Sequence, residues 1–287
     1  MSGDTPASRE PLVTVVVTAY NQADSIGRCI ESIQAQKTDF PIKIIVADDA
    51  SSDGSAEIAR RYAKDDPRIE VLARERNLGL DGNPAEAFRH VKTKYFHILE
   101  CDDYWIDDSK LQSQVDALEA HPECVICGHS LEYRNLDGSL AMLKGRRLKP
   151  GAFRIDTLET TQFVHRSATL FRNLLDDISD EDLAWVVRDV CFFYWMMSKG
   201  KIIYFDRPMS VYTITGAGTW SSLASKAKKE RLQDLYYHID RFLDFKYTKK
   251  FRHQYLPHEG KKLLSFSLPY FRKGRRLIVS ISKLSDK

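Results

Sequence analysis

The feature that most constrains this chain is an apolar run that ends abruptly in acids. Residues Tyr95 to Trp105 read YFHILECDDYW, so that Glu100, Asp102 and Asp103 follow directly on an apolar segment. A short apolar run of this kind is typical of a buried strand. Three carboxylates at its carboxyl end repel one another unless a cation lies among them. The stretch therefore predicts a Mg²⁺ or Mn²⁺ site with oxygen ligands, in which the metal holds a phosphate-bearing substrate.

A second interpretation of the same acids is a loop that caps the following helix. Asp107, Asp108 and Ser109 already offer caps to a helix over Ser109–Ala120. The capping interpretation therefore leaves Asp102 and Asp103 without a role, but this stretch alone does not decide between the two.

The first hundred residues alternate strands with helices. Apolar, β-branched segments at Leu12–Thr18, Ile42–Ala47 and Ile69–Ala73 predict strands that are buried on both faces. We expect the third helix to start at Pro84, a residue that suits the first helical position. Short connections between such elements predict a parallel, doubly wound, Rossmann-like α/β sheet. The polar ends of its strands then meet at one crevice, where open α/β sheets bind ligands.

Missing motifs and a modest charge exclude several functions. The chain contains neither a GxGxxG after its first strand nor a GxxxxGK[ST], which argues against a dinucleotide fold and a P-loop. The net charge of +3 is too small to indicate a nucleic-acid partner. Cys124 and Cys127 form a CxxC without a second pair, so that reduced thiols are favoured over a zinc site.

The pattern changes after Trp105, where the predicted elements become more varied. We expect strands at Cys124–Tyr133, Ser139–Leu143, Lys201–Phe205 and Pro208–Tyr212, a strand or loop at Phe163–Phe171, one long helix at Leu183–Ser198, and loops at Lys144–Pro150 and Thr213–Ser222. Asp189 is the one acid inside the apolar part of that long helix.

The C-terminal part is helical in pattern and basic. We divide the chain into a domain of residues 1–222, with halves 11–107 and 108–222, and a helical extension of residues 223–287. Residues 261–287 mix Lys and Arg with apolar side chains, which predicts binding to an anionic membrane surface. A solvated helical appendage or a homodimer contact fits equally. The polar start of the chain and the lack of a membrane-length apolar run predict a cytoplasmic protein, peripheral on the inner face of the membrane.

Several segments together resemble the inverting glycosyltransferases of family 2, which have the GT-A fold. They are VTVVVTAYN at Val13–Asn21, VADDASSDGS at Val46–Ser55, RNLG at Arg76–Gly79, HILECDDYW at His97–Trp105 and the later Arg188–Ile202. The chain is most similar to the bacterial spore-coat and surface-polysaccharide type. The resemblance covers Pro11–Ser222.

The resemblance implies a role for particular residues. The nucleotide site would comprise Thr18, Ala19 and Tyr20 around the base, Asp49 accepting from the base's imino N–H, Arg76 and Asn77 along the pocket, and Asp102 near the ribose and the metal. Asp103 would ligate a Mn²⁺ or Mg²⁺ ion. Asp189 would be the general base that takes the proton of the acceptor hydroxyl. The alternative for Asp189 is a salt bridge to Arg188 or a helix cap.

The chain also departs from the family pattern. Glu100 stands where the family usually has Asp, and Arg188 stands where an acid often precedes the base. Thr213 and Thr215 occupy the neighbourhood in which many relatives carry Arg and His. His165 is a candidate to replace that histidine, with a purely structural role as the alternative.

These observations predict a metal-dependent inverting glycosyltransferase. Its donor would be a UDP- or dTDP-linked sugar, and its acceptor a surface polysaccharide or a polyprenyl-linked glycan. A sugar-phosphate nucleotidyltransferase and a non-catalytic nucleotide-sugar-binding module are the alternatives.

Overall fold

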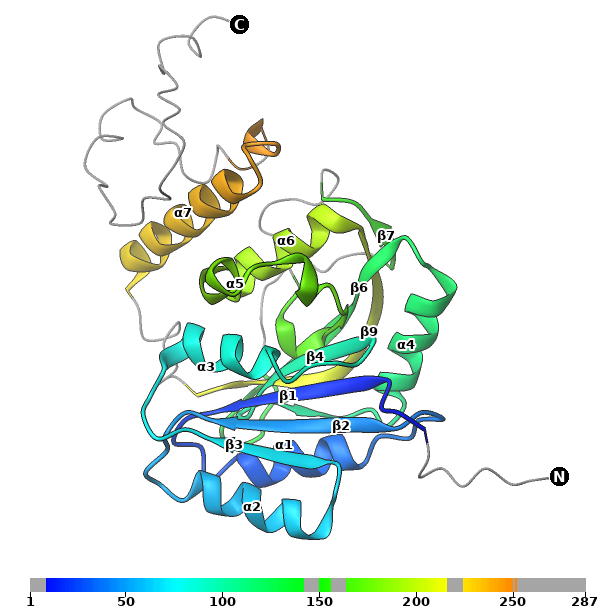
Figure 1. Cartoon of the computed structure of the whole chain (residues 1–287), viewed down its shortest axis with the longest axis vertical. Helices are drawn as coiled ribbons and strands as arrows, with labels where there is room; N and C mark the ends of the chain where they lie inside the picture. Colours follow the sequence, from blue (N-terminus) through cyan, green and yellow to red (C-terminus); the bar gives the residue numbers. More distant parts are fainter. Residues whose placement is uncertain (1–8, 142–149, 156–163, 216–223, 250, 252–287) are drawn as a thin grey trace, which may run out of the picture. The chain divides into compact units, whose positions relative to one another are not determined.

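The computed structural model describes residues 9–141, 150–155, 164–215, 224–249 and 251. Within these residues, nine strands form one mixed sheet in the order β3-β2-β1-β4-β8-β6-β9-β5, with β7 also paired to β9 (Figure 1). The strands are β1 Val13–Ala19, β2 Ile42–Asp48, β3 Ile69–Ala73, β4 Tyr95–Glu100, β5 Tyr104–Trp105, β6 Cys124–Asn135, β7 Gly151–Phe153, β8 Thr169–Arg172 and β9 Lys201–Ile214. The helices are α1 Ile26–Gln34, α2 Ser55–Asp65, α3 Gly79–Phe88, α4 Lys110–Ala120, α5 Asp180–Val186, α6 Asp189–Lys199 and α7 Ser225–Phe242, with the short 3₁₀ turns η2 Arg166–Ala168 and η3 Leu175–Asp177.

The four N-terminal strands are parallel, and their carboxyl ends lie at one edge of the sheet. Ala19 at the end of β1 is opposite Asp48 in β2. Thr18 is opposite Glu100 at the end of β4. β8 then pairs antiparallel with β4, so that the sheet is mixed beyond this point. The predicted α/β sheet, with its strand ends at one common edge, is therefore confirmed.

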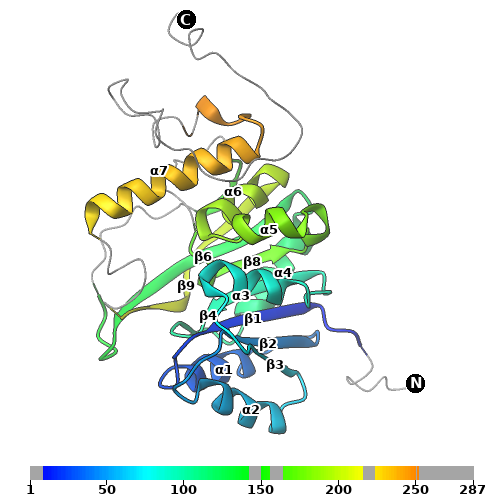
Figure 2. The same ribbon diagram turned by 60° about the vertical axis from the view of Figure 1, so that its left-hand side comes forward.

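Side chains alternate between two cores because the sheet is covered on both faces. Val13, Val15 and Val17 pack on one face with the apolar sides of α1, α2 and α4. Val16 and Phe96 pack on the other face with α3, α5, α6 and α7. Figure 2 shows α1 and α2 on one side of β1–β3, and α3, α5 and α6 on the other. Both faces being buried explains the nearly continuous apolar sequences of these strands.

Phe192 on α6 lies at the centre of an aromatic cluster in this second core. Its ring centroid is 5.1 Å from that of Phe171, 5.5 Å from that of Trp195 and 5.6 Å from that of Phe88. We expect Phe192→Ala to lower the free energy of unfolding by about 3–5 kcal/mol, since it removes a fully packed ring and leaves a cavity. Urea denaturation measures this loss. Phe192→Leu should lose clearly less, and a loss under about 1 kcal/mol in the Ala variant would contradict the described packing.

The third helix begins at Gly79 and not at the predicted Pro84. The carboxylate of Asp49 accepts hydrogen bonds from the backbone N–H groups of Leu78 and Gly79, at 2.6 and 2.8 Å. These bonds satisfy amide groups that the start of a helix leaves without partners, so the helix forms earlier. Pro84 consequently lies inside α3.

The single long helix predicted at Leu183–Ser198 is also wrong. The segment forms two helices, because Arg188 has extended backbone angles (φ −61°, ψ 138°) between them. Ser179 starts α5 earlier than expected by accepting a hydrogen bond from the N–H of Asp182. Asp189 is therefore the first residue of α6, and not an interior residue of one long helix.

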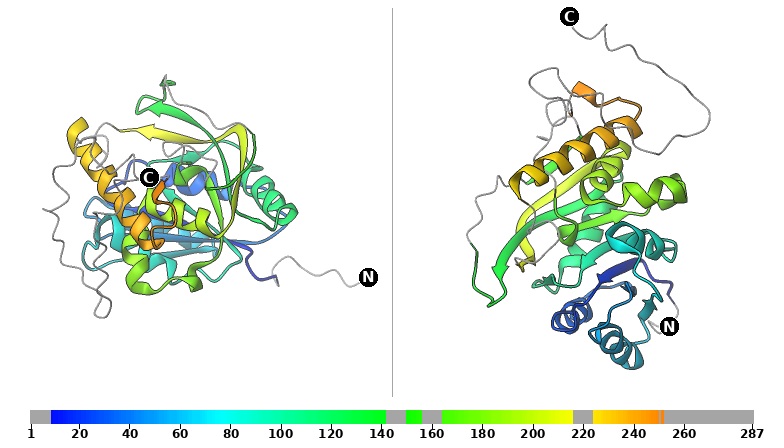
Figure 3. Two further views of the ribbon diagram at one scale, coloured as in Figure 1. Left: turned by 90° about the horizontal axis from the view of Figure 1, so that it is seen from above. Right: turned by 90° about the vertical axis from the view of Figure 1, so that its left-hand side faces the viewer.

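Two predicted strands merge into the single strand β9. Lys201–Phe205 and Pro208–Tyr212 are both parts of it, and it runs beside β6 (Figure 3). The pairing shifts register between His129 and Leu131 of β6, which leaves Pro208 outside the paired positions. Proline has no N–H to donate, so an irregularity of this kind accommodates it.

The predicted hairpin after β6 is present as a turn. The N–H of Gly138 donates to the carbonyl of Asn135 at 2.9 Å, and Leu140 forms one β-bridge with Arg134. The predicted strand Ser139–Leu143 is thus reduced to this bridge over its described part, because residues 142–149 lie outside the described residues. Most of the predicted loops Lys144–Pro150 and Thr213–Ser222 lies outside them as well.

The predicted C-terminal extension is described only at its start. α7 packs against α6 through Tyr236 and Tyr194, whose ring centroids are 6.0 Å apart. Contacts divide the chain into a unit of residues 1–255 and a unit of residues 256–287. The division at residue 222 stays a prediction, and residues 261–287 lie outside the described part. Among the described residues, no helix has both the length and the apolar character that a membrane span requires.

Candidate active site at the strand ends

The ends of β1, β2 and β4 are joined by backbone hydrogen bonds. The N–H of Asp49 donates to the carbonyl of Ala19 at 2.9 Å, and the N–H of Cys101 donates to the carbonyl of Thr18 at 3.1 Å. Tyr20 follows directly and is 52% exposed. An exposed aromatic ring at this edge of the sheet is suited to stacking on a planar base.

Asp49 is buried beside the start of α3. Its carboxylate accepts the two amide hydrogen bonds at that helix start. Its backbone carbonyl accepts a third hydrogen bond, from the side-chain nitrogen of Asn77 at 3.3 Å. Each carboxylate oxygen has a second lone pair, so Asp49 retains the capacity to accept from a ligand. Arg76 is exposed in the same connection. The structure thus brings Asp49, Asn77 and the end of β1 together.

Asp103 is held in a fixed position although it is 1% exposed. One carboxylate oxygen accepts the backbone N–H of Thr213 at 2.9 Å, and the other accepts the hydroxyl of Ser167. The hydroxyl of Thr213 also donates to the backbone carbonyl of Asp102 at 2.6 Å. Ser210 in turn donates to the carbonyl of Ser167 at 3.0 Å. β9 and η2 therefore fix the carboxylate of Asp103 and the backbone of Asp102.

The acids at the end of β4 destabilise one another's ionised form. Burial, with the nearby charge of Glu100, raises the pKa of Asp102 to about 6. Burial also raises the pKa of Asp103 well above its usual range, with further contributions from Asp102 and Glu100. Such shifts at a crevice mark a site where a bound cation would relieve the repulsion.

His165 completes a set of three potential ligands. Single ligand atoms of Glu100, Asp103 and His165 all lie within 4.8 Å of one another. The Nδ1 atom of His165 is 4.0 Å from a carboxylate oxygen of Asp103, and its ring packs edge-to-face on Tyr212. Two carboxylates and one imidazole fit a Mn²⁺ ion, which accepts both oxygen and nitrogen ligands. A Mg²⁺ ion fits the two carboxylates only.

Arg166 adds a cation to the same group. Its Nε atom is 3.8 Å from a carboxylate oxygen of Glu100, and its side chain is 13% exposed. Arg28 on α1 stacks on the ring of Tyr104 at 4.1 Å and lowers the pKa of Asp102 slightly against the larger effect of burial. The site therefore offers both acids for a cation and guanidinium groups for an anion.

Asp189 is placed only through its backbone, since its side chain lies outside the described part. Its neighbour Arg188 donates from Nε to a carboxylate oxygen of Asp81 at 2.9 Å. Asp81 lies in the first turn of α3, next to the amides that Asp49 holds. The start of α6 is thus connected to the helix that borders the predicted nucleotide pocket. Arg188 forms an ion pair with Asp81, and the alternative pairing of Arg188 with Asp189 stays a prediction.

The sequence analysis does not identify Arg166 and Ser167 as residues of this site, and it names Thr213 only as a departure from the family pattern. All three come from segments far along the chain. Glu100 is one of the three acids for which the sequence predicts a metal site, and the structure places it in the candidate ligand group. The polar triplet His165-Arg166-Ser167 directly precedes the apolar strand β8. It is a usable signal, because β8 is antiparallel to β4 and its start therefore lies at the edge where β4 ends. His165 itself had been named as a candidate.

Asp102 should make the metal-free protein less stable at neutral pH. Its pKa is about 6 in the native state against an ordinary 3.8, so the native state binds more protons between these values. Stability then falls as pH rises through that window. We expect Asp102→Asn to raise the free energy of unfolding by about 2 kcal/mol at pH 7.5 and little at pH 4. Urea titrations in EDTA at both values test this, and a variant less stable than wild type at pH 7.5 would refute it.

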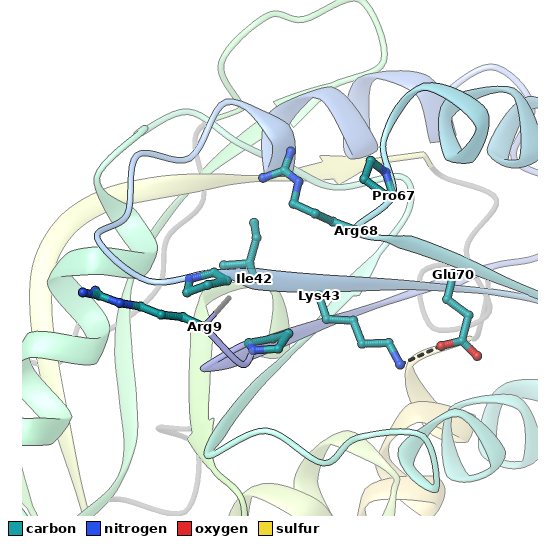
Figure 4. Close-up of a pocket in the computed structure, with 8 residues that line it drawn as sticks. Arg9, Ile42, Lys43, Pro67, Arg68 and Glu70 are labelled. Atoms are coloured by element: carbon teal, nitrogen blue, oxygen red, sulfur yellow. Dashed lines mark ion pairs between the residues drawn. The ribbon is translucent and has the colours of Figure 1, made fainter. Parts of the chain in front are cut away.

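A separate hollow lies at the opposite, amino-terminal edge of the sheet (Figure 4). It has a volume of about 650 Å³ and is lined by Arg9, Pro11, Pro41, Ile42, Lys43, Pro67, Arg68 and Glu70. Two of its cations already have acidic partners: Lys43 is 2.7 Å from Glu70, and Arg68 is 2.7 Å from Asp66. Because these two cations are already paired, the hollow offers fewer charged groups for binding a ligand than the strand ends do.

Comparison with known families gives one match over most of the sheet. The model of glycosyl transferase family 2 matches residues 14–179. This range contains the ends of β1, β2 and β4 and the turn that carries His165 and Arg166.

Individual relatives match parts of the chain. The uncharacterized protein Rv1520 of Mycobacterium tuberculosis is 28% identical over 224 residues, which are 76% of this chain and 63% of that protein. The chain thus spans less than two thirds of that relative's length. The putative teichuronic acid biosynthesis glycosyltransferase TuaG of Bacillus subtilis is 34% identical over 107 residues, which are 37% of this chain and 42% of TuaG.

Two solved structures share the fold. The mannosyltransferase PcManGT from Pyrobaculum calidifontis, in complex with GDP-Man and Mn²⁺, is similar with a TM-score of 0.59 and 18% identity over 87% of this chain and 70% of its own. TarS from S. aureus, in complex with UDP, is similar with a TM-score of 0.56 and 18% identity over 83% of this chain and 74% of its own. At these identities the similarity shows the fold alone.

Proposed function

The chain belongs to glycosyl transferase family 2 and has the GT-A fold, and we propose that it is a metal-dependent inverting enzyme that uses a nucleoside-diphosphate sugar as its donor. The observation that carries this proposal is the group of Glu100, Asp103 and His165 at the ends of the parallel strands. A glycosyltransferase of this fold has to neutralise a diphosphate leaving group at that edge. A bound Mn²⁺ would supply the positive charge that stabilises this leaving group.

The chain's own residues supply the other parts of such a reaction. Tyr20, Thr18 and Ala19 would border the base, and Asp49 would accept its imino N–H. Asp102 would lie near the ribose. Asp103, fixed by Ser167 and Thr213, keeps its ligand oxygens in place before a cation binds. A preorganised carboxylate of this kind loses little conformational entropy on binding.

Asp189 is proposed as the general base. It would accept the proton of the acceptor hydroxyl while that oxygen attacks the anomeric carbon, so that the configuration there inverts. Support comes from its place at the start of α6, which Arg188 ties to α3 through Asp81. This connection couples the base-bearing helix to the nucleotide side of the site.

The identity of the two substrates is a finer proposal. We propose a UDP- or dTDP-linked donor and a surface-polysaccharide or polyprenyl-linked acceptor, used at the cytoplasmic face of a membrane. Support comes from the similar structures that contain UDP or GDP-Man, and from the similarity to a putative teichuronic acid biosynthesis glycosyltransferase. The basic residues 261–287 would bring the enzyme to an anionic lipid surface.

A thermal-shift panel tests the proposed donor site. UDP, dTDP, GDP, CDP, ATP and NAD are compared in Mn²⁺ and in EDTA, each at about 100 times an expected dissociation constant, where binding adds roughly 2.7 kcal/mol. We expect one nucleoside diphosphate to raise the melting temperature in Mn²⁺ only. A shift with the triphosphate alone would favour a nucleotidyltransferase. Binding of the corresponding nucleoside-diphosphate sugar without hydrolysis or transfer of its sugar would favour a binding module.

A further inference from the structure

A buried polar pair on α4 lies outside the groups assigned to the reaction. Lys110 and Gln114 are both 0% exposed and lie one helical turn apart, on the same face of the helix. The Nζ atom of Lys110 donates to the side-chain oxygen of Gln114 at 2.8 Å. Burial of an amine and an amide costs free energy unless both form hydrogen bonds, and this bond offsets part of that cost.

Each member of the pair contacts one of the two segments that carry candidate metal ligands. The Nζ atom of Lys110 lies 4.2 Å from the ring centroid of Trp105, which follows Asp103 closely in the chain. The side-chain nitrogen of Gln114 donates to the carbonyl of Ala168 in η2 at 3.2 Å. The pair therefore connects the segment of Asp103 with η2 through one rigid helix.

We propose that Lys110 and Gln114 are positioning residues of the metal site, which together set the separation of Asp103 and His165 and thereby the affinity for a divalent cation. The inference rests on the proposed function, because it takes the group of Glu100, Asp103 and His165 as the metal site. Neither Lys110 nor Gln114 is a ligand in this proposal. Both act through the backbone of the segments that carry the ligands.

The hydrogen bonds of Gln114 allow only one orientation of its amide. Its nitrogen donates to two carbonyls, that of Ala168 and that of Cys127 on β6 at 2.9 Å. Its oxygen accepts from Lys110. A flipped amide would turn its oxygen toward two carbonyls, which only accept hydrogen bonds. Gln114 is therefore fixed between α4, β6 and η2.

The contacts inside the ligand group depend on where η2 lies. The Nδ1 atom of His165, directly before η2, is 4.0 Å from a carboxylate oxygen of Asp103. Ser167 in η2 donates its hydroxyl to the same oxygen. A site binds a cation more tightly when its ligands already stand at the required geometry before binding. A shift of η2 relative to β5 would separate the ligands and weaken binding.

The size of the effect follows from how far the pair stands from the ion. Groups that hydrogen-bond directly to metal ligands typically contribute 10- to 100-fold to metal affinity. Lys110 and Gln114 are one step further removed, so we expect the lower end of this range, about tenfold.

Lys110→Met tests the connection while keeping the packed volume nearly constant. Burial lowers the pKa of the Lys110 amine well below its usual range, so that methionine replaces a group whose charged form is disfavoured. This gain offsets the hydrogen bond that Gln114 loses, and the metal-free protein should melt close to wild type. The Mn²⁺ dissociation constant should nevertheless rise about tenfold. The value of kcat at saturating Mn²⁺ should stay near that of wild type, because excess cation fills the site.

Gln114→Met breaks the same connection from the other side. It should raise the Mn²⁺ dissociation constant about as much, and it should also lower the metal-free melting temperature, because the Lys110 amine and two carbonyls lose a partner. In the double variant the unpaired amine is gone, so that the melting temperature should recover in part. Its Mn²⁺ affinity should stay that of Gln114→Met, since two residues that act as one unit are not additive.

Two measurements on the full chain separate metal affinity from stability. Electron paramagnetic resonance of unbound Mn²⁺, with Mn²⁺ as the only titrant, gives the dissociation constant, and thermal denaturation in EDTA gives the metal-free stability. Asp103→Asn identifies the signal of the proposed site. Gln112→Met is the matched control, because Gln112 donates to Asp116 one turn further along α4, at 2.9 Å and on the exposed side. This control should bind Mn²⁺ as wild type does.

The outcomes distinguish the pair from the metal site itself. Wild type with no Mn²⁺ binding, or with binding that Asp103→Asn leaves intact, would overturn the proposed metal site and the role of the pair together. Asp103-dependent binding that Lys110→Met leaves unchanged would overturn only the role of the pair. A lower kcat at saturating Mn²⁺ with an unchanged dissociation constant would overturn it as well. If Gln114→Met does not fold, Lys110→Met alone decides.

Discussion

Replacing Asp103 with Asn should lower kcat/KM for sugar transfer by about 10²- to 10³-fold, the size of effect seen when one group that stabilises developing charge is removed. Asp103 is nearly fully buried, and Ser167 and Thr213 fix its carboxylate beside Glu100 and His165. The amide side chain carries no charge and ligates a divalent cation weakly, so that the Mn²⁺ dissociation constant should rise in parallel. Steady-state kinetics at increasing Mn²⁺ concentration measures both quantities.

Two controls separate this effect from a loss of structure. The metal-free Asp103→Asn protein should be at least as stable as wild type at pH 7.5, because burial disfavours the ionised carboxylate that it replaces. Asp116→Asn, on the exposed side of α4, should leave both kinetics and Mn²⁺ affinity unchanged. Full activity of Asp103→Asn at low Mn²⁺ would show that the metal binds elsewhere or takes no part.

The second large effect is expected at Asp189. Asp189→Asn should lower kcat by about 10²- to 10⁴-fold, the usual contribution of a positioned general base. The KM for the donor should change little, because the proposed role is in removal of the acceptor proton and not in nucleotide binding. Initial rates over a range of donor and acceptor concentrations give both constants.

The neighbouring acids of α5 are the controls for Asp189. Glu181 lies in the first turn of α5, is exposed, and has the same charge a short distance along the chain. Glu181→Gln should retain activity close to that of wild type. If Glu181→Gln abolished turnover while Asp189→Asn retained it, the base would have to be assigned to the acidic turn.

The strands of the first half were predictable because each element carries its own signal. The β-branched runs of β1 and β2 are apolar on both faces, and helices on both sides of the sheet require that pattern. Parallel pairing then places the residues after each strand at one edge. The common edge at which these strands end was therefore predictable from local sequence and this single rule.

The predicted helix boundaries are wrong where a side chain that is distant in sequence determines the start of the helix. α3 starts at Gly79 because Asp49, at the end of β2, accepts its amide and that of Leu78. α6 starts at Asp189 because Arg188 leaves helical geometry and pairs with Asp81. Local propensity contains no information about such partners, so each boundary was misplaced.

The residues that hydrogen-bond to Asp103 were unpredictable for the same reason. Ser167 and Thr213 reach Asp103 only because β8 and β9 fold back beside β4 and β5. Ser167 lies in the turn η2 just before β8, and Thr213 lies in β9 beyond the register shift opposite His129 and Leu131 of β6. A polar residue before a strand indicates a site only after its position in the sheet is known.

The most direct measurement is a crystal structure of the full chain with Mn²⁺ and the nucleoside diphosphate that gives the thermal shift, using anomalous scattering from manganese. The proposed function predicts one anomalous peak within bonding distance of Asp103 and His165, with the diphosphate next to that peak, and with the base beside Tyr20 and Asp49. A manganese peak away from Asp103, or a nucleotide bound at another edge of the sheet, would contradict the assignment of the acidic strand end as the metal–diphosphate site.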